Sequence, residues 1–430
     1  MRIPPLPRPP LLPDPLRRAT VPDDLESVTD YGNEVTPSAV GMTSDSIEHI
    51  WNGVRDIYRG GAHPAIQLCV RRYGRVVLNR SIGYAHGNGP GDGPGTEKTL
   101  ATTETPFCVY SASKAITATV AHLLDERGLL HIGDRVSDYI PEFGRNGKKT
   151  ITIAQVLSHR AGIPNHPSEV TDLAFINDRE AILEALCNSR PIMRPGKLQA
   201  YHALTGGAII AELTERVTGR GIRDVLQTEI LDPLDFRWTN YGVAPRDVSK
   251  VATNYLTGLP SPPPVSTALN RLLGVTPREA VDISNDPRFL TGVVPAGNVV
   301  TTALELSRFF EMLRREGELD GVRILQPRTV HRAISEQSFL EVDFALGLPI
   351  RYSYGFMLGG KYLSLFGPHA EHAFGHLGFT NVVGYADPDR GLAVGLLTSG
   401  KPVLYPEVFN WLGLMGRIGS AAGMARQDQT

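Results

Sequence analysis

The chain has 430 residues, of which 41% are hydrophobic and 20% are charged, and its formal net charge is −2 at pH 7. This composition is typical of a globular protein with a large core, and the absence of a basic run argues against nucleic acid or an anionic membrane surface as a partner. No apolar run is long enough for a membrane span, and the odd number of cysteines favours a reducing, cytoplasmic location over a disulfide framework.

The N-terminal region is rich in proline and has little periodicity, which predicts an extended arm over residues 1–40. Its prolines do not fit the apolar core of a signal peptide. Peripheral association of this arm with a cell envelope stays open. Apolar residues then recur at helical spacing from Ile47 to Ile57, which predicts an amphipathic helix.

A β-hairpin is expected next, because the apolar runs 65–70 and 75–80 flank a turn at 72–74. The following stretch, 87–95, has many glycines but lacks the spacing of a phosphate-binding loop. We therefore expect a flexible loop there.

The segment 112–124 is mostly small or apolar and contains neither glycine nor proline, which predicts a buried helix. Lys114 lies in its first turn, where a buried ammonium group is costly unless it is paired or its pKa shifts. Residues i and i+3 share a helix face, so the Lys114 amine can lie against the Ser111 hydroxyl. This is the arrangement that an activated serine requires. The alternative is structural, with Ser111 as an N-cap and Lys114 extended to the surface.

Two other residues, Cys108 and His159, could have either a structural or a chemical role. Cys108 is expected to be a small buried hydrophobic residue rather than a reactive thiol. His159 follows a short helix at 152–157 and is expected to bond backbone carbonyls rather than to act in catalysis.

The remaining elements predict an α/β (α+β) fold, with an antiparallel sheet from both chain ends flanked by helices and a mainly helical domain inserted between them. Helices are expected over 180–235, and the Pro-rich stretch 258–290 is expected to be a long loop or lid beside a cleft. The predicted boundaries are 1–40 for the arm, 41–108 with 295–425 for the sheet domain, and 109–294 for the helical domain. Later elements are a helix at 307–315, strands at 354–358, 382–386 and 392–397, and a closing helix at 405–415.

Two further stretches, 194–207 around Tyr201 and 373–381 around His376, join the Ser111 stretch as possible motifs. In this order the three resemble the motifs of the β-lactamase-related serine hydrolases, which include class C β-lactamases, D,D-peptidases, D-aminopeptidases and family VIII carboxylesterases. The resemblance extends from about residue 43 to the C-terminal helix. No G-x-S-x-G sequence occurs, so the α/β-hydrolase fold is not indicated.

The resemblance implies that Ser111 is the nucleophile and that Lys114 and Tyr201 form the base pair and later the acid. It implies no cofactor. By the same analogy, the backbone N–H groups of Ser111 and Phe379 form the oxyanion hole. His376-Leu377-Gly378 aligns with the third motif, so His376 is expected beside Tyr201 or the substrate, and Gly378 is expected to let a substrate approach closely. A zinc site at His369, His372 and His376 is disfavoured, because that spacing needs a helix and the glycines suggest a strand.

Two departures from the family pattern indicate the substrate class. The third position of the tyrosine motif is Ala203, which cannot bond a substrate amide, and His376 replaces the lysine that suits a β-lactam carboxylate. Both changes favour a small, uncharged carboxylic ester with a short or medium acyl chain. The alternatives are an acyltransferase that uses the same acyl-enzyme, weak β-lactamase or D-aminopeptidase activity, and a non-catalytic binding protein on this fold.

Overall fold

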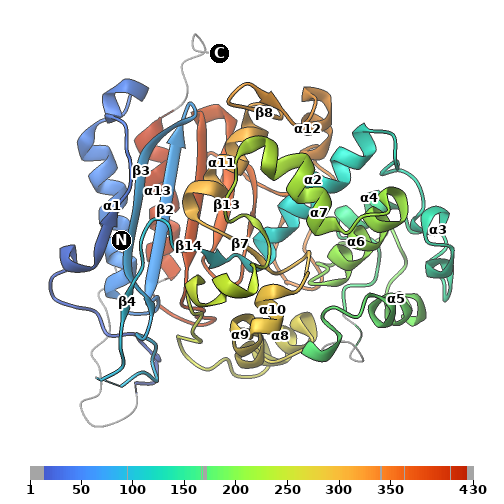
Figure 1. Cartoon of the computed structure of the whole chain (residues 1–430), viewed down its shortest axis with the longest axis horizontal. Coiled ribbons are helices and arrows are strands. Elements are labelled where there is room, and N and C mark those ends of the chain that lie inside the picture. The colour runs from blue at the N-terminus through green and yellow to red at the C-terminus, as the bar shows by residue number, and fades with distance from the viewer. Residues whose placement is uncertain are drawn as a thin grey trace.

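The computed structural model describes residues 14–93, 95–165, 167, 172–338, 341–362, 364–406 and 408–423. Within these residues the main sheet has nine strands in the order β1-β3-β2-β14-β13-β12-β11-β10, with β4 paired to β3, and all its named pairs are antiparallel. The central pair joins β2 to β14, so the two ends of the chain form one sheet (Figure 1). The strands are β1 (Thr29–Tyr31), β2 (Ala65–Arg72), β3 (Arg75–His86), β4 (Thr99–Leu100), β10 (Arg351–Tyr352), β11 (Met357–Leu358), β12 (Phe374–Leu377), β13 (Val383–Asp387) and β14 (Leu392–Thr398).

Both faces of the sheet are covered, because the central strands are apolar on both sides. Ile66 and Leu68 of β2 pack in the core that contains α1 (Ser44–Arg59) and α13 (Val408–Ala422). Cys69 of β2 faces the other core, which α11 (Ala303–Arg314) shares with the helices beyond it. Gly395 of β14 lets α11 approach, since a Cβ there would lie 2.5 Å from the Ala303 carbonyl oxygen.

The middle of the chain is mainly helical and lies beyond α11 in Figure 1. A second, three-stranded sheet, β5-β7-β6, holds the start and the end of this region together. Its strands are β5 (Phe107–Cys108), β6 (Asn240–Tyr241) and β7 (Val299–Thr301). The helices are α2 (Ser113–Glu126), α3 (Val136–Tyr139), α4 (Ile153–Leu157), α5 (Arg179–Asn188), α6 (Thr205–Thr218), α7 (Ile222–Leu226), α8 (Val265–Leu273), α9 (Pro277–Asn285) and α10 (Pro287–Thr291), followed after α11 by a hairpin, β8 (Glu318–Leu319) and β9 (Val322–Arg323), and by α12 (Pro327–Ala333).

The stretch 258–290 differs from its prediction as a long loop. It contains α8 and α9 and most of α10. Its prolines do not break these helices, because Pro277 and Pro287 occupy the first helical position, where a missing N–H costs nothing. Thr276 also caps α9 through its side chain. The prolines therefore start helices here.

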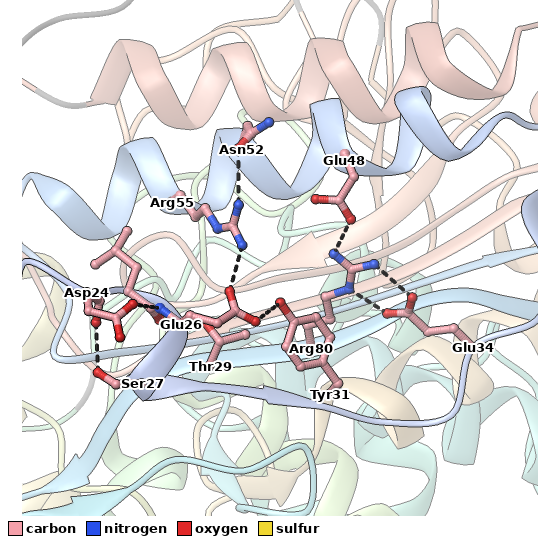
Figure 2. Close-up of polar contacts among 11 residues, drawn as sticks. Asp24, Glu26, Ser27, Thr29, Tyr31, Glu34, Glu48, Asn52, Arg55 and Arg80 are labelled. Atoms are coloured by element: carbon pink, nitrogen blue, oxygen red, sulfur yellow. Dashed lines mark hydrogen bonds and ion pairs between the residues drawn. The ribbon is translucent and has the colours of Figure 1, made fainter.

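The residues before α1 are joined to the sheet by ion pairs, which Figure 2 shows. Strand β1 pairs with β3 at one edge. Arg80 of β3 contacts Glu34 at 2.8 Å and Glu48 of α1 at 2.6 Å, and Arg55 of α1 reaches Glu26 at 3.1 Å. The described part of the predicted arm thus lies against the body of the protein.

The expected hairpin corresponds to β2 and β3, which pair in an antiparallel register. The expected strand at 354–358 is shorter, because Gly355 has a φ of +108° and only Met357 and Leu358 form β11. The expected fold class, an antiparallel sheet from both chain ends with helices between them, is confirmed. None of the helices in the described part of the chain has both the length and the apolar character needed to span a bilayer.

Candidate active site

Ser111 lies in a tight turn between β5 and α2. The preceding residue, Tyr110, has a φ of +48°, an unfavourable conformation for a residue with a side chain. Ser113 holds the turn in place, because its hydroxyl donates to the Tyr110 carbonyl at 2.5 Å and accepts from the Val299 N–H of β7 at 3.0 Å. Ser111 itself is only partly buried, whereas the residues on either side of it are buried.

Lys114 points from the first turn of α2 back to Ser111. Its Nζ donates to Ser111 Oγ and to the Ala296 carbonyl oxygen, each at 3.0 Å. The side chain is 8% exposed, and no carboxylate within the described residues forms an ion pair with it. Burial lowers the pKa of Lys114 to about 7. A substantial fraction of this amine is therefore neutral at pH 7 and able to accept a proton.

Tyr201 lies against both residues from the segment before α6. Lys114 Nζ is 4.8 Å from the centre of its ring. Burial raises the pKa of Tyr201 well above its ordinary value, and a hydrogen bond with the Ser111 side chain acts in the opposite direction. Tyr201 is therefore protonated at neutral pH, and its hydroxyl can pass a proton on.

His376 is in β12, and its ring centre is 6.1 Å from that of Tyr201. The side chain is 1% exposed, and burial together with nearby Lys114 lowers the pKa of His376 to about 3. Its Nδ1 lies 2.7 Å from the Leu377 carbonyl oxygen, to which it donates. His376 is thus neutral, and Nε2 carries a lone pair.

The residues after His376 approach the turn that holds Ser111. The Gly378 N–H donates to the Val382 carbonyl at 2.7 Å, whereas the Phe379 N–H has no hydrogen-bond partner among the described residues. A Cβ at residue 378 would overlap the Val109 carbonyl oxygen. Gly378 is therefore needed for close packing against the turn, a reason that differs from the expected approach of a substrate. The Phe379 ring lies 5.8 Å from the ring of Tyr110, so the residue with this free N–H packs against the turn that holds Ser111.

His159 packs against the ring of Tyr201, and no hydrogen bond joins it to Ser111 or Lys114 among the described residues. Its Nδ1 accepts from the His202 backbone N–H at 3.1 Å, and its ring lies between those of Tyr201 at 4.7 Å and Tyr352 at 4.8 Å. Within the described residues, its ring does not form the expected bonds to backbone carbonyls. Because Nδ1 accepts, the ring of neutral His159 carries its hydrogen on Nε2.

The sequence also raises two alternative sites, a reactive thiol at Cys108 and a zinc site at His369, His372 and His376. Cys108 is buried, which raises the pKa of its thiol to about 11. His372 pairs with Asp389 at 2.8 Å, and in the part of the chain that the structure describes no three His, Cys, Asp or Glu side chains gather closely enough to hold a metal ion.

Some contacts of the site have no signal in the sequence. Asp343 is fully buried, and its Oδ1 accepts from the backbone N–H of Tyr201 at 3.1 Å. The Ala296 carbonyl oxygen, which accepts from Lys114, is a backbone atom, so no pattern of side chains in the sequence indicates it. Ser113 could have been suspected, because it lies between Ser111 and Lys114, but the turn it stabilises is visible only in the structure.

Comparison with known proteins shows the family of the chain. Residues 53–410 match the family model described as Beta-lactamase. The chain therefore belongs to the β-lactamase family, whose members typically carry a serine nucleophile, and it is a hydrolase of that fold.

Among curated proteins, the chain is 30% identical over 333 residues to the esterase/beta-lactamase LipL of Mycobacterium tuberculosis, covering 74% of this chain and 75% of LipL. Among solved structures, a penicillin-binding protein homologue from Caulobacter crescentus has a TM-score of 0.75 and 24% identity, covering 89% of this chain and 99% of that one. A family VIII carboxylesterase has a TM-score of 0.73 and 24% identity, and the match covers 88% of this chain and 99% of the carboxylesterase. These two structures share the fold.

Proposed function

We propose that the protein is a serine esterase that hydrolyses short- to medium-chain carboxylic esters through an acyl-enzyme on Ser111. The observation that carries this proposal is the 3.0 Å contact between Lys114 Nζ and Ser111 Oγ, made by an amine whose pKa is about 7. A serine hydroxyl is a weak nucleophile until a neighbouring base takes its proton.

In the first half of the reaction, neutral Lys114 accepts the Ser111 proton as Oγ attacks the ester carbonyl. The negative charge that develops on the carbonyl oxygen is stabilised by the N–H groups of Ser111 and Phe379. When the C–O bond to the alcohol breaks, the proton passes from Lys114, through the Tyr201 hydroxyl, to the leaving oxygen. Because burial keeps Tyr201 protonated, the base is Lys114 and Tyr201 conducts the proton.

In the second half, water replaces the alcohol. The same pair accepts a proton from the attacking water, the acyl–Oγ bond breaks, and the proton returns to Ser111. The products are the carboxylic acid and free enzyme. No group outside the chain is needed for either half.

The surroundings of Ser111 support an uncharged ester as substrate. Ala203 offers no side-chain hydrogen bond, and His376 is neutral because its pKa is about 3. Neither residue favours a substrate carboxylate, which a cation would attract. The name of LipL, an esterase/beta-lactamase, supports ester hydrolysis and makes a β-lactam the natural comparison substrate.

The test is steady-state hydrolysis of p-nitrophenyl esters from acetate to palmitate, beside a chromogenic cephalosporin, for the wild type and Ser111→Ala. We expect turnover to peak at short or medium chains, to exceed cephalosporin cleavage, and to vanish in Ser111→Ala. Product analysis with an added alcohol separates hydrolysis from acyl transfer, because a transferase would form the new ester. Equal rates for wild type and Ser111→Ala would refute the proposal.

A further inference from the structure

A small cavity adjoins Lys114, and Ser111 is not among the residues that line it. Its volume is about 30 Å³, and its walls include Lys114 of α2, Val156 of α4, His159, His202 and Gly206 of α6. One water molecule needs on the order of 10–15 Å³ measured in this way, together with two or more polar partners. The cavity is large enough for water, and its polar groups are those near the proposed base.

His202 is the polar group that most needs a partner there. Its side chain is fully buried, and neither ring nitrogen makes a hydrogen bond of good geometry to a described residue. Burial lowers the pKa of His202 to about 4, and a weak hydrogen bond with the Val156 backbone carbonyl acts in the opposite direction, so the Val156 carbonyl can serve one ring nitrogen and the other lacks a partner. A neutral imidazole has one donor and one acceptor, and burying either without a partner is unfavourable.

One N–H donor of the Lys114 ammonium group also lacks an acceptor among the described residues. Its ammonium form carries three N–H donors, and the structure gives two acceptors, Ser111 Oγ and the Ala296 carbonyl oxygen. A third acceptor is required when this buried group is charged. The cavity adjoins Lys114, so a water there can accept that hydrogen and donate to His202.

We propose that this cavity holds ordered water that bridges Lys114 Nζ and the His202 ring, and that His202 is a positioning residue for the proton on Lys114. The water site follows from the cavity and its polar walls alone. Its influence on catalysis rests on the proposed function. A water that accepts from the ammonium form stabilises that form and makes the proton harder to lose.

The other titratable groups that face Lys114 do not obscure the effect of the water on the pKa of Lys114. They are Tyr201 before α6, His159 after α4 and His376 in β12. Burial lowers the pKa of both histidines and raises that of Tyr201, so none of them titrates near neutral pH. Lys401 also has a pKa of about 7, and its amine lies 4.9 Å from the centre of the Tyr110 ring. Lys401 is unchanged in the variant described below, so a shift of the acid limb between variant and wild type reports proton loss from Lys114.

The direct test is a high-resolution crystal structure of the wild-type enzyme. We expect electron density for a water within hydrogen-bond distance of both Lys114 Nζ and a His202 ring nitrogen. An empty cavity, or direct bonds from both ring nitrogens of His202 to the protein, would overturn the water site. This readout does not depend on turnover, so it separates a failure of the inference from a failure of the esterase proposal.

Gly206→Ala tests the catalytic consequence. A Cβ at residue 206 would lie 3.6 Å from Val156 Cγ1 and 3.7 Å from His202 Cβ, so the methyl group fits and occupies cavity space. Loss of the water removes a hydrogen bond from the Lys114 ammonium form, and the acid limb of kcat/KM should move to lower pH by about one unit.

The matched control is Gly413→Ala in α13, another helical glycine whose Cβ would meet nothing within 4 Å. It should leave the pH profile unchanged. An unchanged profile in Gly206→Ala, in a crystal whose cavity has lost its water, would overturn the role of the water and of His202.

Discussion

The carboxylate of Asp343 holds the backbone of Tyr201, with a 3.1 Å hydrogen bond from the Tyr201 N–H to Oδ1. The same oxygen accepts from the N–H groups of Ala345 and Leu346, each at 2.9 Å. One buried oxygen therefore ties the segment that carries Tyr201 to the loop that follows Asp343.

Replacing Asp343 should misplace Tyr201. Asp343→Ala leaves the buried N–H group of Tyr201 and the partly buried N–H groups of Ala345 and Leu346 without this acceptor, at a cost of about 1–3 kcal/mol in the free energy of unfolding. We expect kcat for a p-nitrophenyl ester to fall by at least tenfold. Asp343→Asn keeps an acceptor oxygen and should retain most of both stability and activity, measured by thermal unfolding and ester hydrolysis. Equal behaviour of the two variants would contradict this role.

Ester hydrolysis should increase with pH through about pH 7, because Lys114 must lose its proton before it can act as a base. The measurement is kcat/KM between pH 5 and 9 in buffers of constant ionic strength. Tyr201→Phe should lower kcat strongly but leave the midpoint of this limb in place. A midpoint near pH 4 would assign the limb to another group.

Lys114→Met should abolish activity and stabilise the fold. The pKa of Lys114 is lowered from its unfolded value near 10.5 to about 7. Below pH 7 folding must hold a charged, buried amine, and this cost shrinks as pH rises from 7 towards 10, where the unfolded chain also loses the proton. The gain of Lys114→Met over wild type should therefore be greatest at or below pH 7, on the order of a few kcal/mol.

Urea unfolding of both proteins at pH 6, 8 and 10 measures this difference. Lys401 is also buried with a pKa of about 7, but it is present in both proteins and cancels. A difference that grows with pH would contradict the sign of the argument.

Gly378→Ala should reduce activity more than stability. The new Cβ would collide with the Val109 carbonyl oxygen, so the end of β12 must shift away from the turn that holds Ser111. We expect at least a tenfold loss of kcat with the helix and strand content preserved in circular dichroism. Gly133→Ala, where a Cβ meets nothing within 4 Å, is the control. Full activity in Gly378→Ala would show that the strand end is free to move.

The Arg80 ion pairs in Figure 2 should affect stability alone. Arg80 is 7% exposed and bonds Glu34 through two nitrogens, at 2.8 and 2.9 Å. Glu34→Gln should cost about 1–3 kcal/mol in the free energy of unfolding, because a buried charge loses its partner. Glu48→Gln should cost less, since the Glu48 side chain is 49% exposed. Both variants should keep wild-type kcat, and a lower kcat in either would link this edge of the sheet to the active site.

Contacts between near neighbours could be predicted from the sequence. Ser111 and Lys114 are three residues apart in a helical turn, and the expected contact is present at 3.0 Å. The strands of the hairpin follow from the two runs 65–70 and 75–80 that flank a short turn, which is also a local pattern. The stretch 258–290 differs from its prediction because proline, which is common in irregular segments, also begins helices.

Contacts between distant residues could not be predicted in this way. Asp343 is 142 residues from Tyr201, and nothing in either local pattern connects them. The need for glycine at 378 likewise depends on where the Val109 carbonyl lies in the folded protein. Local spacing thus indicates which side chains react, whereas the groups that hold them are found only when the chain has folded.

The pairing of β2 with β14 has a consequence for synthesis on the ribosome. Gln67 of β2 lies opposite Leu397 of β14, so the central ladder of the sheet cannot form until almost the whole chain has emerged. Until then the nascent hairpin of β2 and β3 exposes an unpaired edge and apolar faces, which favours aggregation or capture by a chaperone. A premature stop codon before Leu392 removes β14 entirely and leaves the earlier strands without their partner.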